Sequence, residues 1–213
     1  MDIQVWSDVV CPWCYIGKKR LEKAVAEFPG QVTVTYRAFQ LDPSPVPTPV
    51  RTKDAMAAKF GGRERADQMF EHVTGLAAGD GLHLDFDRAI AANTFDAHRL
   101  IAWAAGQGRQ AEMLDALQQA HFVKGIDIGS RPALAEVSGS IGLGPAAALA
   151  YLESPAGTEA VNTDLREAQE LGITSVPTFV VDGKYAIQGA QEPATILAAF
   201  EEISRRESVD IDQ

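Results

Sequence analysis

The chain places its only two cysteines in one tetrapeptide, Cys11-Pro12-Trp13-Cys14, between a strand pattern and a helix pattern. Residues 3–6 alternate apolar and polar side chains, as a strand does. After the tetrapeptide, Leu21, Val25 and Phe28 have the i, i+4, i+7 spacing of a helix with one buried face. A strand that leads through C-x-x-C into a helix predicts a thiol–disulfide redox site, because the helix N-terminus stabilises a thiolate at the first cysteine.

Other uses of two closely spaced cysteines fit the sequence less well. Tetrahedral zinc needs more ligands than this pair, and no second cysteine pair supplies them. The four histidines are dispersed and form no H-x-x-x-H-type pair: His72, His83, His98 and His121. A structural disulfide is disfavoured because a two-residue spacer closes a very small loop. We therefore expect redox chemistry and no metal, with an inert pair of buried thiols as the remaining alternative.

Charge and the N-terminal residues limit the partners and the compartment. The net charge of −10 argues against nucleic acid, whose phosphates need a basic face, and gives no reason to expect binding to an anionic membrane. No apolar run approaches the length of a membrane span, and residues 1–8 lack the pattern of a signal peptide. If residue 1 is the natural start, we expect a cytoplasmic protein, in which a disulfide is transient and catalytic. No feature marks a subunit interface, so the oligomeric state stays open.

The first part of the chain changes from a mixed pattern to a helical one. Residues 32–39 alternate and are rich in β-branched and aromatic side chains, so they predict a second strand. Strand, helix and strand in this order form a βαβ unit with parallel pairing. The proline-rich residues 42–49 suit a stiff connector. Residues 52–171 are rich in helix-forming residues interrupted by glycine breaks, which predicts a series of helices.

The β pattern returns near the C-terminus. Residues 178–181 and 184–187 flank Asp182-Gly183 and predict a hairpin with a tight turn. Residues 193–206 predict a last helix, and residues 209–213 a loose tail. We therefore expect an α/β domain built from residues 1–50 and 172–208, with an inserted helical domain at 51–171.

Several stretches carry a resemblance to a known family. The chain resembles DsbA-like thioredoxin-fold proteins, and most closely their FrnE branch, which includes 2-hydroxychromene-2-carboxylate isomerases. The matching stretches lie in order along the chain: Ser7-Asp8-Val9-Val10-Cys11-Pro12-Trp13-Cys14-Tyr15-Ile16-Gly17, Phe39-Gln40-Leu41-Asp42-Pro43, Asn93-Thr94-Phe95-Asp96-Ala97-His98-Arg99-Leu100, Gly172-Ile173-Thr174-Ser175-Val176-Pro177-Thr178-Phe179 and Gln188-Gly189-Ala190-Gln191.

The resemblance implies roles for particular residues. Cys11 would be the attacking thiolate and Cys14 the resolving thiol, in a thioredoxin-like fold whose large helical insertion covers the redox face. The Val176–Pro177 bond would be cis, in a loop that faces the cysteines and offers backbone groups to an extended substrate. The other candidates for substrate binding are Pro12, Trp13, Asn93, His98 and Gln191. Structural alternatives stay open for two of them, because Asn93 also suits a helix N-cap and His98 a buried imidazole with satisfied hydrogen bonds.

Three functions are compatible with these features. The first is a thiol–disulfide oxidoreductase that acts through a mixed disulfide on a protein or small-molecule disulfide, with glutathione or another low-molecular-weight thiol as a candidate co-substrate. The second is a glutathione-dependent isomerase or kappa-like transferase for a small aromatic or polyketide-type molecule. Such enzymes resemble this fold but usually carry serine at the position of Cys11, and they hold glutathione with a Ser-Asp pair where this chain has Ala190-Gln191. We therefore expect no tightly bound cofactor and favour the oxidoreductase, with a thiol-bearing chaperone as the third alternative.

Overall fold

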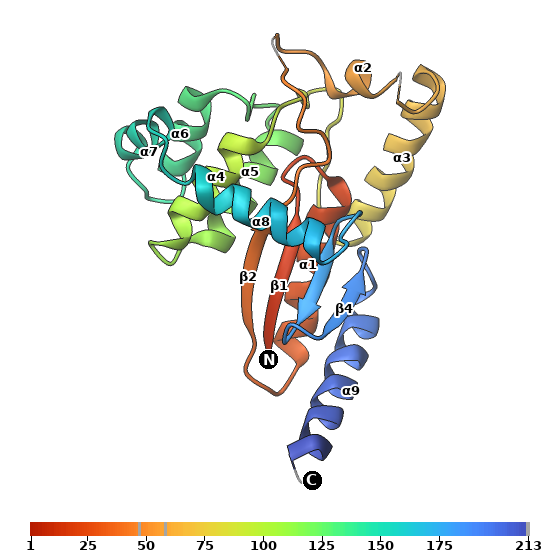
Figure 1. The fold of residues 1–213 in the computed structure, drawn as a ribbon. Helices are drawn as coiled ribbons and strands as arrows, with labels where there is room; N and C mark the ends of the chain where they lie inside the picture. Colours follow the sequence, from red (N-terminus) through yellow and green to blue (C-terminus); the bar gives the residue numbers. More distant parts are fainter. Residues whose placement is uncertain (47, 58, 212–213) are drawn as a thin grey trace.

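The computed structural model describes residues 1–46, 48–57 and 59–211, and its elements follow the predicted order of strand, helix, strand, helices, hairpin and helix (Figure 1). The elements are β1 (Asp2–Ser7), α1 (Pro12–Glu27), β2 (Thr33–Ala38), α2 (Thr52–Ala57), α3 (Arg63–Gly79), α4 (Phe95–Ala105), α5 (Gln110–Phe122), α6 (Arg131–Gly139), α7 (Pro145–Glu153), α8 (Thr158–Glu170), β3 (Thr178–Val181), β4 (Tyr185–Gln188) and α9 (Pro193–Ile211).

The four strands form one sheet in the order β2-β1-β3-β4. β1 pairs with β2 in parallel, which confirms the prediction of a βαβ unit, and pairs with β3 in antiparallel orientation. β3 and β4 form the predicted hairpin. Asp182 and Gly183 both have positive φ angles, 51° and 66°, and the Lys184 N–H donates to the Val181 carbonyl at 3.0 Å, as a tight turn of this type requires. Both ends of the chain therefore contribute to one sheet.

The alternation of side chains along β1 determines what covers each face of the sheet. On one face, α1 and α9 pack against the sheet through an apolar core whose members include Ile3, Val5, Leu21, Phe179, Ile196 and Phe200. On the other face, Trp6 and Val180 pack against Ala168 of α8. In Figure 1, α8 accordingly crosses the sheet on the side opposite to α1. The central strand is buried on both faces, and its carboxyl end leads directly to the cysteines.

A second apolar cluster joins the start of α1 to the helices that follow β2. Tyr15 and Ile16 of α1 pack there with Ala66, Phe70, Val73 and Ala77 of α3 and with Leu84, Phe86 and Phe122. The Phe70 and Phe86 rings lie 4.3 Å apart, and Phe122 stacks on Tyr15 at 5.9 Å. Residues from α3 and α5 are thus held against the first two turns of α1, next to Cys14.

The C-terminal helix is longer than the sequence predicts. α9 continues to Ile211 instead of ending near residue 206, so the prediction of a loose tail from residue 209 is wrong for residues 209–211, and residues 212 and 213 lie outside the described part. Glu202 pairs with Arg205 and Arg206 three and four residues later, and such pairs favour helix at this end. Pro47 of the predicted connector also lies outside the described residues. Within the described residues, no helix has the length and apolar character needed to cross a membrane.

Candidate active site

Cys11 sits at the N-cap of α1, where the chain leaves β1 and turns into the helix. Its N–H donates to the Asp8 carbonyl at 3.2 Å, and its own carbonyl accepts the N–H of Cys14 at 3.0 Å. Pro12 occupies the first turn of the helix, where its missing N–H removes no hydrogen bond. The Cys11 side chain is therefore placed at the positive end of the helix dipole.

The two cysteines are buried free thiols, whereas the tryptophan between them is exposed to solvent. Cys11 and Cys14 are 4% and 2% exposed, whereas Trp13 is 38% exposed. Burial raises the pKa of the Cys14 thiol well above its usual value, and its hydrogen bond to Cys11 raises it further. Cys14 is thus held in the neutral thiol form at physiological pH, while Trp13 presents an apolar surface to solvent beside the pair.

The loop before β3 lies directly against the cysteines. The Val176–Pro177 peptide bond is cis, and the Cys11 Sγ lies 3.8 Å from the Val176 carbonyl oxygen, to which its thiol donates. Gly17 of α1 permits this approach, because a Cβ at that position would stand only 2.7 Å from Pro177 Cγ. The Gly189 N–H donates to the Pro177 carbonyl at 2.8 Å from the other side. Contacts from the start of α1 and from Gly189 therefore fix this loop over the sulfur of Cys11.

A buried carboxylate and an imidazole lie behind the cysteines. Asp8 is 1% exposed, and its Oδ2 accepts the N–H of Leu41 at 2.8 Å. His98, 4% exposed, has its Nε2 2.9 Å from the Phe39 carbonyl and 3.4 Å from Asp8 Oδ1. Because a carbonyl oxygen only accepts hydrogen bonds, the contact with Phe39 requires a hydrogen on His98 Nε2. His98 therefore contacts the Asp8 carboxylate and the end of β2.

A second buried histidine lies on α5. His121 is fully buried, neither ring nitrogen has a hydrogen-bond partner, and its ring packs edge-on against Phe122 at 4.6 Å. Burial lowers the pKa of His121 to about 4, against a smaller opposing effect of the Asp8 charge. At neutral pH His121 is therefore an uncharged imidazole within the electrostatic reach of Asp8.

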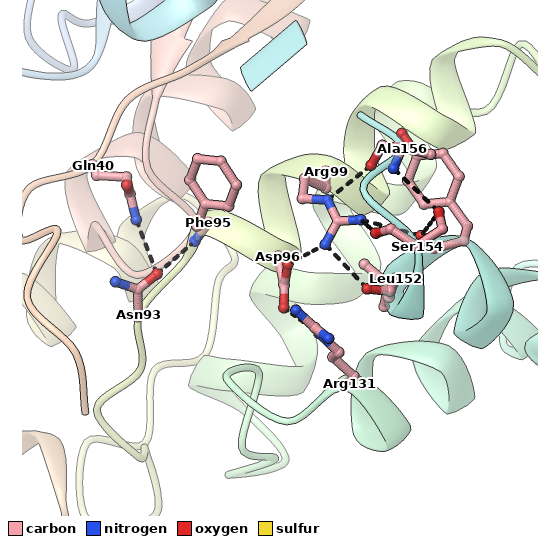
Figure 2. Close-up of polar contacts among 10 residues, drawn as sticks. Gln40, Asn93, Phe95, Asp96, Arg99, Arg131, Leu152, Ser154 and Ala156 are labelled. Carbon is pink, nitrogen blue, oxygen red and sulfur yellow. Dashed lines mark hydrogen bonds and ion pairs between the residues drawn. The ribbon is translucent and has the colours of Figure 1, made fainter. Parts of the chain in front are cut away.

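Asn93 makes its hydrogen bonds with the proline-rich connector and with the start of α4. Its Oδ1 accepts from Gln40 Nε2 at 3.2 Å and from the Phe95 N–H at 3.0 Å (Figure 2). Its Nδ2 donates to the carbonyl oxygens of Pro43 and Ser44 at 2.8 and 3.2 Å. These contacts fasten the connector to the start of α4, but the N-cap of α4 is Thr94, so the alternative that Asn93 is the N-cap residue is wrong.

Gln191 is exposed and organises the loop after β4. Its side chain donates to the Gln188 carbonyl at 2.8 Å, and its N–H donates to the Gly189 carbonyl at 2.9 Å. Arg20 of α1 donates to the carbonyl of Ala190 at 2.8 Å. The loop that contains Gln191 is thus tied to α1, and through Gly189 it also supports the cis-proline loop.

Two buried or closely packed residues, Gly17 and His121, were not among the candidates from the sequence. Gly17 lies inside a helical pattern, and an isolated glycine there is a weak signal of close backbone approach. His121 follows Leu114 and Leu117 on the apolar face of α5, which indicates burial but not its proximity to Asp8. Among the described residues, no group of three or more His, Cys, Asp or Glu side chains could hold a metal ion.

Comparison with known proteins supports the fold along almost the whole chain. The model of the DSBA-like thioredoxin domain matches residues 2–201. A probable DsbA oxidoreductase from Streptomyces coelicolor is 35% identical, with a TM-score of 0.87 over 95% of this chain and 89% of its own. The cytosolic disulfide reductase DsbM from Pseudomonas aeruginosa is 26% identical, with a TM-score of 0.64 over 96% and 99% of the two chains. A 2-hydroxychromene-2-carboxylate isomerase, 18% identical, shares the fold with a TM-score of 0.72 over 98% of each chain. The chain belongs to the DsbA-like thioredoxin family.

Proposed function

We propose that the protein is a thiol–disulfide oxidoreductase whose redox centre is the Cys11–Cys14 pair. The observation that carries this proposal is the placement of two free thiols in the first turn of α1, with the Cys11 sulfur 3.8 Å from the carbonyl before the cis-proline. Helix N-termini stabilise thiolates, and a second thiol one turn along can close a disulfide with the first. The relatives named as DsbA oxidoreductase and disulfide reductase support the same reading.

The reaction divides into two exchanges. The Cys11 thiolate attacks one sulfur of the substrate disulfide, so that a mixed disulfide forms and the other substrate sulfur leaves as a thiolate. Cys14 then loses its proton and attacks the Cys11 sulfur, which releases the second substrate thiolate. The substrate gains two electrons, and the Cys11–Cys14 disulfide is the oxidised product. In the reverse direction, the same steps oxidise a dithiol.

The surroundings of the pair favour an extended thiol or disulfide substrate. The exposed face of Trp13 and the backbone around Val176 and Pro177 lie next to the cysteines and offer an apolar contact and main-chain hydrogen bonds. Glutathione is a candidate co-substrate, since DsbM, 25% identical in this comparison, has been solved with it. We place the protein in the cytoplasm, as the name of that reductase suggests.

A redox titration tests the proposal directly. The reduced protein is equilibrated with glutathione buffers of increasing potential, and the fluorescence of Trp13 beside the pair reports the state of the cysteines. We expect a single two-electron transition that disappears in Cys11→Ser, and a stable mixed disulfide in Cys14→Ser. The midpoint potential then distinguishes a reductant from an oxidant.

The same variants identify the competing function. An isomerase or transferase that only binds glutathione needs no second cysteine. If the wild-type protein shows no reversible disulfide, and glutathione-dependent turnover of a small aromatic substrate survives in Cys14→Ser, the proposal is wrong and the isomerase reading replaces it.

A further inference from the structure

The two edge strands of the sheet, β2 and β4, differ in how their outer backbone groups are satisfied. On β2, the Gln110 side chain accepts the Tyr36 N–H at 3.0 Å and donates to the Tyr36 carbonyl at 2.9 Å. Two residues further along, Asp164 accepts the Ala38 N–H at 2.9 Å. An open strand edge is a template for pairing with another chain, and these side chains close that template on β2.

The register of the hairpin determines which backbone groups of β4 point away from β3. One step beyond the opposed residues Thr178 and Gln188, the Gly189 N–H donates to the Pro177 carbonyl at 2.8 Å, so these two residues form a hydrogen-bonded pair. Hydrogen-bonded and non-hydrogen-bonded pairs alternate along an antiparallel ladder. Counting back from Gly189, Gln188 and Ala186 belong to non-hydrogen-bonded pairs, and their N–H and C=O groups therefore point away from β3.

This outer edge of β4 is closed at one end only. The Gln191 side chain donates to the outward carbonyl of Gln188 at 2.8 Å and so ends the open stretch. Ala186 and Gln188 are exposed, and β4 is the last strand of the described sheet (Figure 1). Within the part of the chain that the structure describes, the N–H and C=O of Ala186 and the N–H of Gln188 are thus directed to solvent.

The outward groups of β4 are complementary to those of a second copy of the chain. An antiparallel strand pair has two-fold symmetry, so two β4 strands can meet at a hydrogen-bonded pair made by Ala186 and its own counterpart. In that register each Ala186 N–H donates to the Ala186 carbonyl of the other copy, and each Gln188 N–H lies toward residue 184 of the other copy. The methyl side chain of Ala186 is too small to hinder the approach.

The helix that covers this part of the sheet presents a second surface on the same side. Glu201, Ser204 and Ser208 of α9 line a groove against Phe28 at the end of α1, so this flank of α9 faces α1. The opposite flank therefore faces the β4 edge. At helical spacing it carries two small and two charged residues, Thr195, Ala199, Glu202 and Arg206.

A two-fold axis at the β4 edge sets opposite charges against each other. The Tyr185 hydroxyl donates to Glu207 at 3.0 Å, so this part of α9 lies over the start of β4. An axis through the Ala186 pair therefore passes near residues 202–206 of α9, and the two α9 helices run antiparallel across it. Arg206 of each copy then lies opposite Glu202 of the other, and these two residues already form an ion pair within the chain.

We infer that the β4 edge and this flank of α9 form the interface of a homodimer, in which two four-stranded sheets join into one. Because the two β4 strands run antiparallel, the two Cys11–Cys14 pairs lie at opposite ends of the joined sheet. Each redox centre is complete within its own chain, so the inference does not depend on the proposed function. An interface built from one short strand and one helix flank is small, and we expect reversible association in the micromolar range.

Sedimentation velocity of the full chain at increasing concentration tests the inference. Ala186→Pro removes the outward N–H, and an edge strand tolerates proline where the N–H makes no bond within the sheet. Ala186→Ser keeps this N–H and is the matched control. Arg206→Glu sets like charges against each other across the axis. Its control is Arg205→Glu, which removes a similar ion pair with Glu202 but lies on the α1 side of α9.

We expect the dissociation constant of the dimer to rise about tenfold or more in Ala186→Pro and in Arg206→Glu, and to stay unchanged in both controls. Exchanging the two charges, with Glu202→Arg added to Arg206→Glu, should restore the dimer because opposite charges meet again. Amide hydrogen exchange at residue 186 should slow as the dimer forms.

Two results would overturn the inference. The first is a wild-type protein that stays monomeric, and an extended peptide that slows exchange at residue 186 in that monomer would then identify a different occupant of the edge. The second is a dimer whose dissociation constant is the same in wild type, folded Ala186→Pro and folded Arg206→Glu, since the copies would then meet through another face. Circular dichroism verifies that each variant is folded.

Discussion

Gly17 is the residue at which the helix and the cis-proline loop come closest. A methyl group at this position would lie 2.7 Å from Pro177 Cγ and 3.4 Å from the ring of Phe179, so the loop or the helix must move. We expect Gly17→Ala to lower the free energy of unfolding by about 1–3 kcal/mol and to slow mixed-disulfide formation, because the Val176 carbonyl is displaced from Cys11. Urea denaturation and stopped-flow fluorescence measure the two effects.

Gly75 provides the matched control for that substitution. It lies inside α3, is exposed, and has no atom within 4 Å of the position of an added Cβ. Gly75→Ala should therefore stabilise the protein by about 0.5–1 kcal/mol through helix propensity alone and leave the redox kinetics unchanged. If Gly17→Ala behaves like Gly75→Ala, the close approach to Pro177 has no energetic consequence.

Residue-level roles were only partly accessible from the sequence, because most depend on long-range contacts. The C-x-x-C pattern is local, so the position of Cys11 at a helix N-cap follows from neighbouring residues. The contact of Gly17 with Pro177 joins residues 160 positions apart and leaves no local pattern. His98 was a candidate for substrate binding, and the structure places its Nε2 between the Phe39 carbonyl and Asp8, which no spacing rule indicates.

At the scale of elements, Arg99 connects α4 to the end of α7. Its side chain is 3% exposed and donates to the carbonyl oxygens of Tyr151, Leu152 and Ala156 at 3.1, 3.1 and 2.9 Å (Figure 2). It also pairs with Asp96 at 2.6 Å. These carbonyls lie at or just beyond the C-terminal turn of α7, where helices leave carbonyl groups unpaired. Arg99 therefore satisfies groups that would otherwise be buried without partners.

Arg99→Met should consequently cost about 3 kcal/mol or more of the free energy of unfolding, since the partly buried carboxylate of Asp96 and the carbonyls around the buried Arg99 lose their donor. Arg131 is the natural comparison because it pairs with the other oxygen of Asp96 at 2.7 Å but is 47% exposed. Arg131→Met should change the stability by less than about 1 kcal/mol. Chemical denaturation of the two variants measures their free energies of unfolding. Similar losses in both variants would show that Arg99 is not the residue that holds α7 to α4.

Elements were more predictable than these connections, because each is defined by a local pattern. The alternation in β1, the Asp182-Gly183 turn and the helical spacing in α1 all agree with the structure. The end of α9 was misplaced: the charge pairs of Glu202 with Arg205 and Arg206 lie inside the predicted range, and the helix continues beyond them to Ile211. Hydrophobic periodicity marks the buried face of a helix well, but it gives little information about where a solvent-exposed end stops.

At the scale of the whole molecule, the buried histidine makes folding sensitive to acid. The pKa of His121 is about 4 in the folded protein, below its usual value of 6.5, because burial disfavours the charged ring. Above pH 6.5 the ring is neutral in both the folded and the unfolded chain, so His121 imposes no pH dependence. Between pH 6.5 and 4 the unfolded chain binds a proton that the folded protein does not, and the free energy of unfolding falls as the pH falls.

Each pH unit in that interval corresponds to about 1.4 kcal/mol, so His121 should account for a loss of about 3 kcal/mol between pH 6.5 and 4. Urea denaturation of the reduced protein at several pH values measures the slope, and His121→Phe should remove this component. Paired carboxylates such as Asp80 add their own acid sensitivity, since salt bridges to Arg20 and Lys23 lower the Asp80 pKa against the opposing effect of burial. That contribution is shared by the wild-type protein and the variant and cancels in their difference. Equal slopes for the two proteins would mean that His121 is protonated, or reached by water, in the folded state.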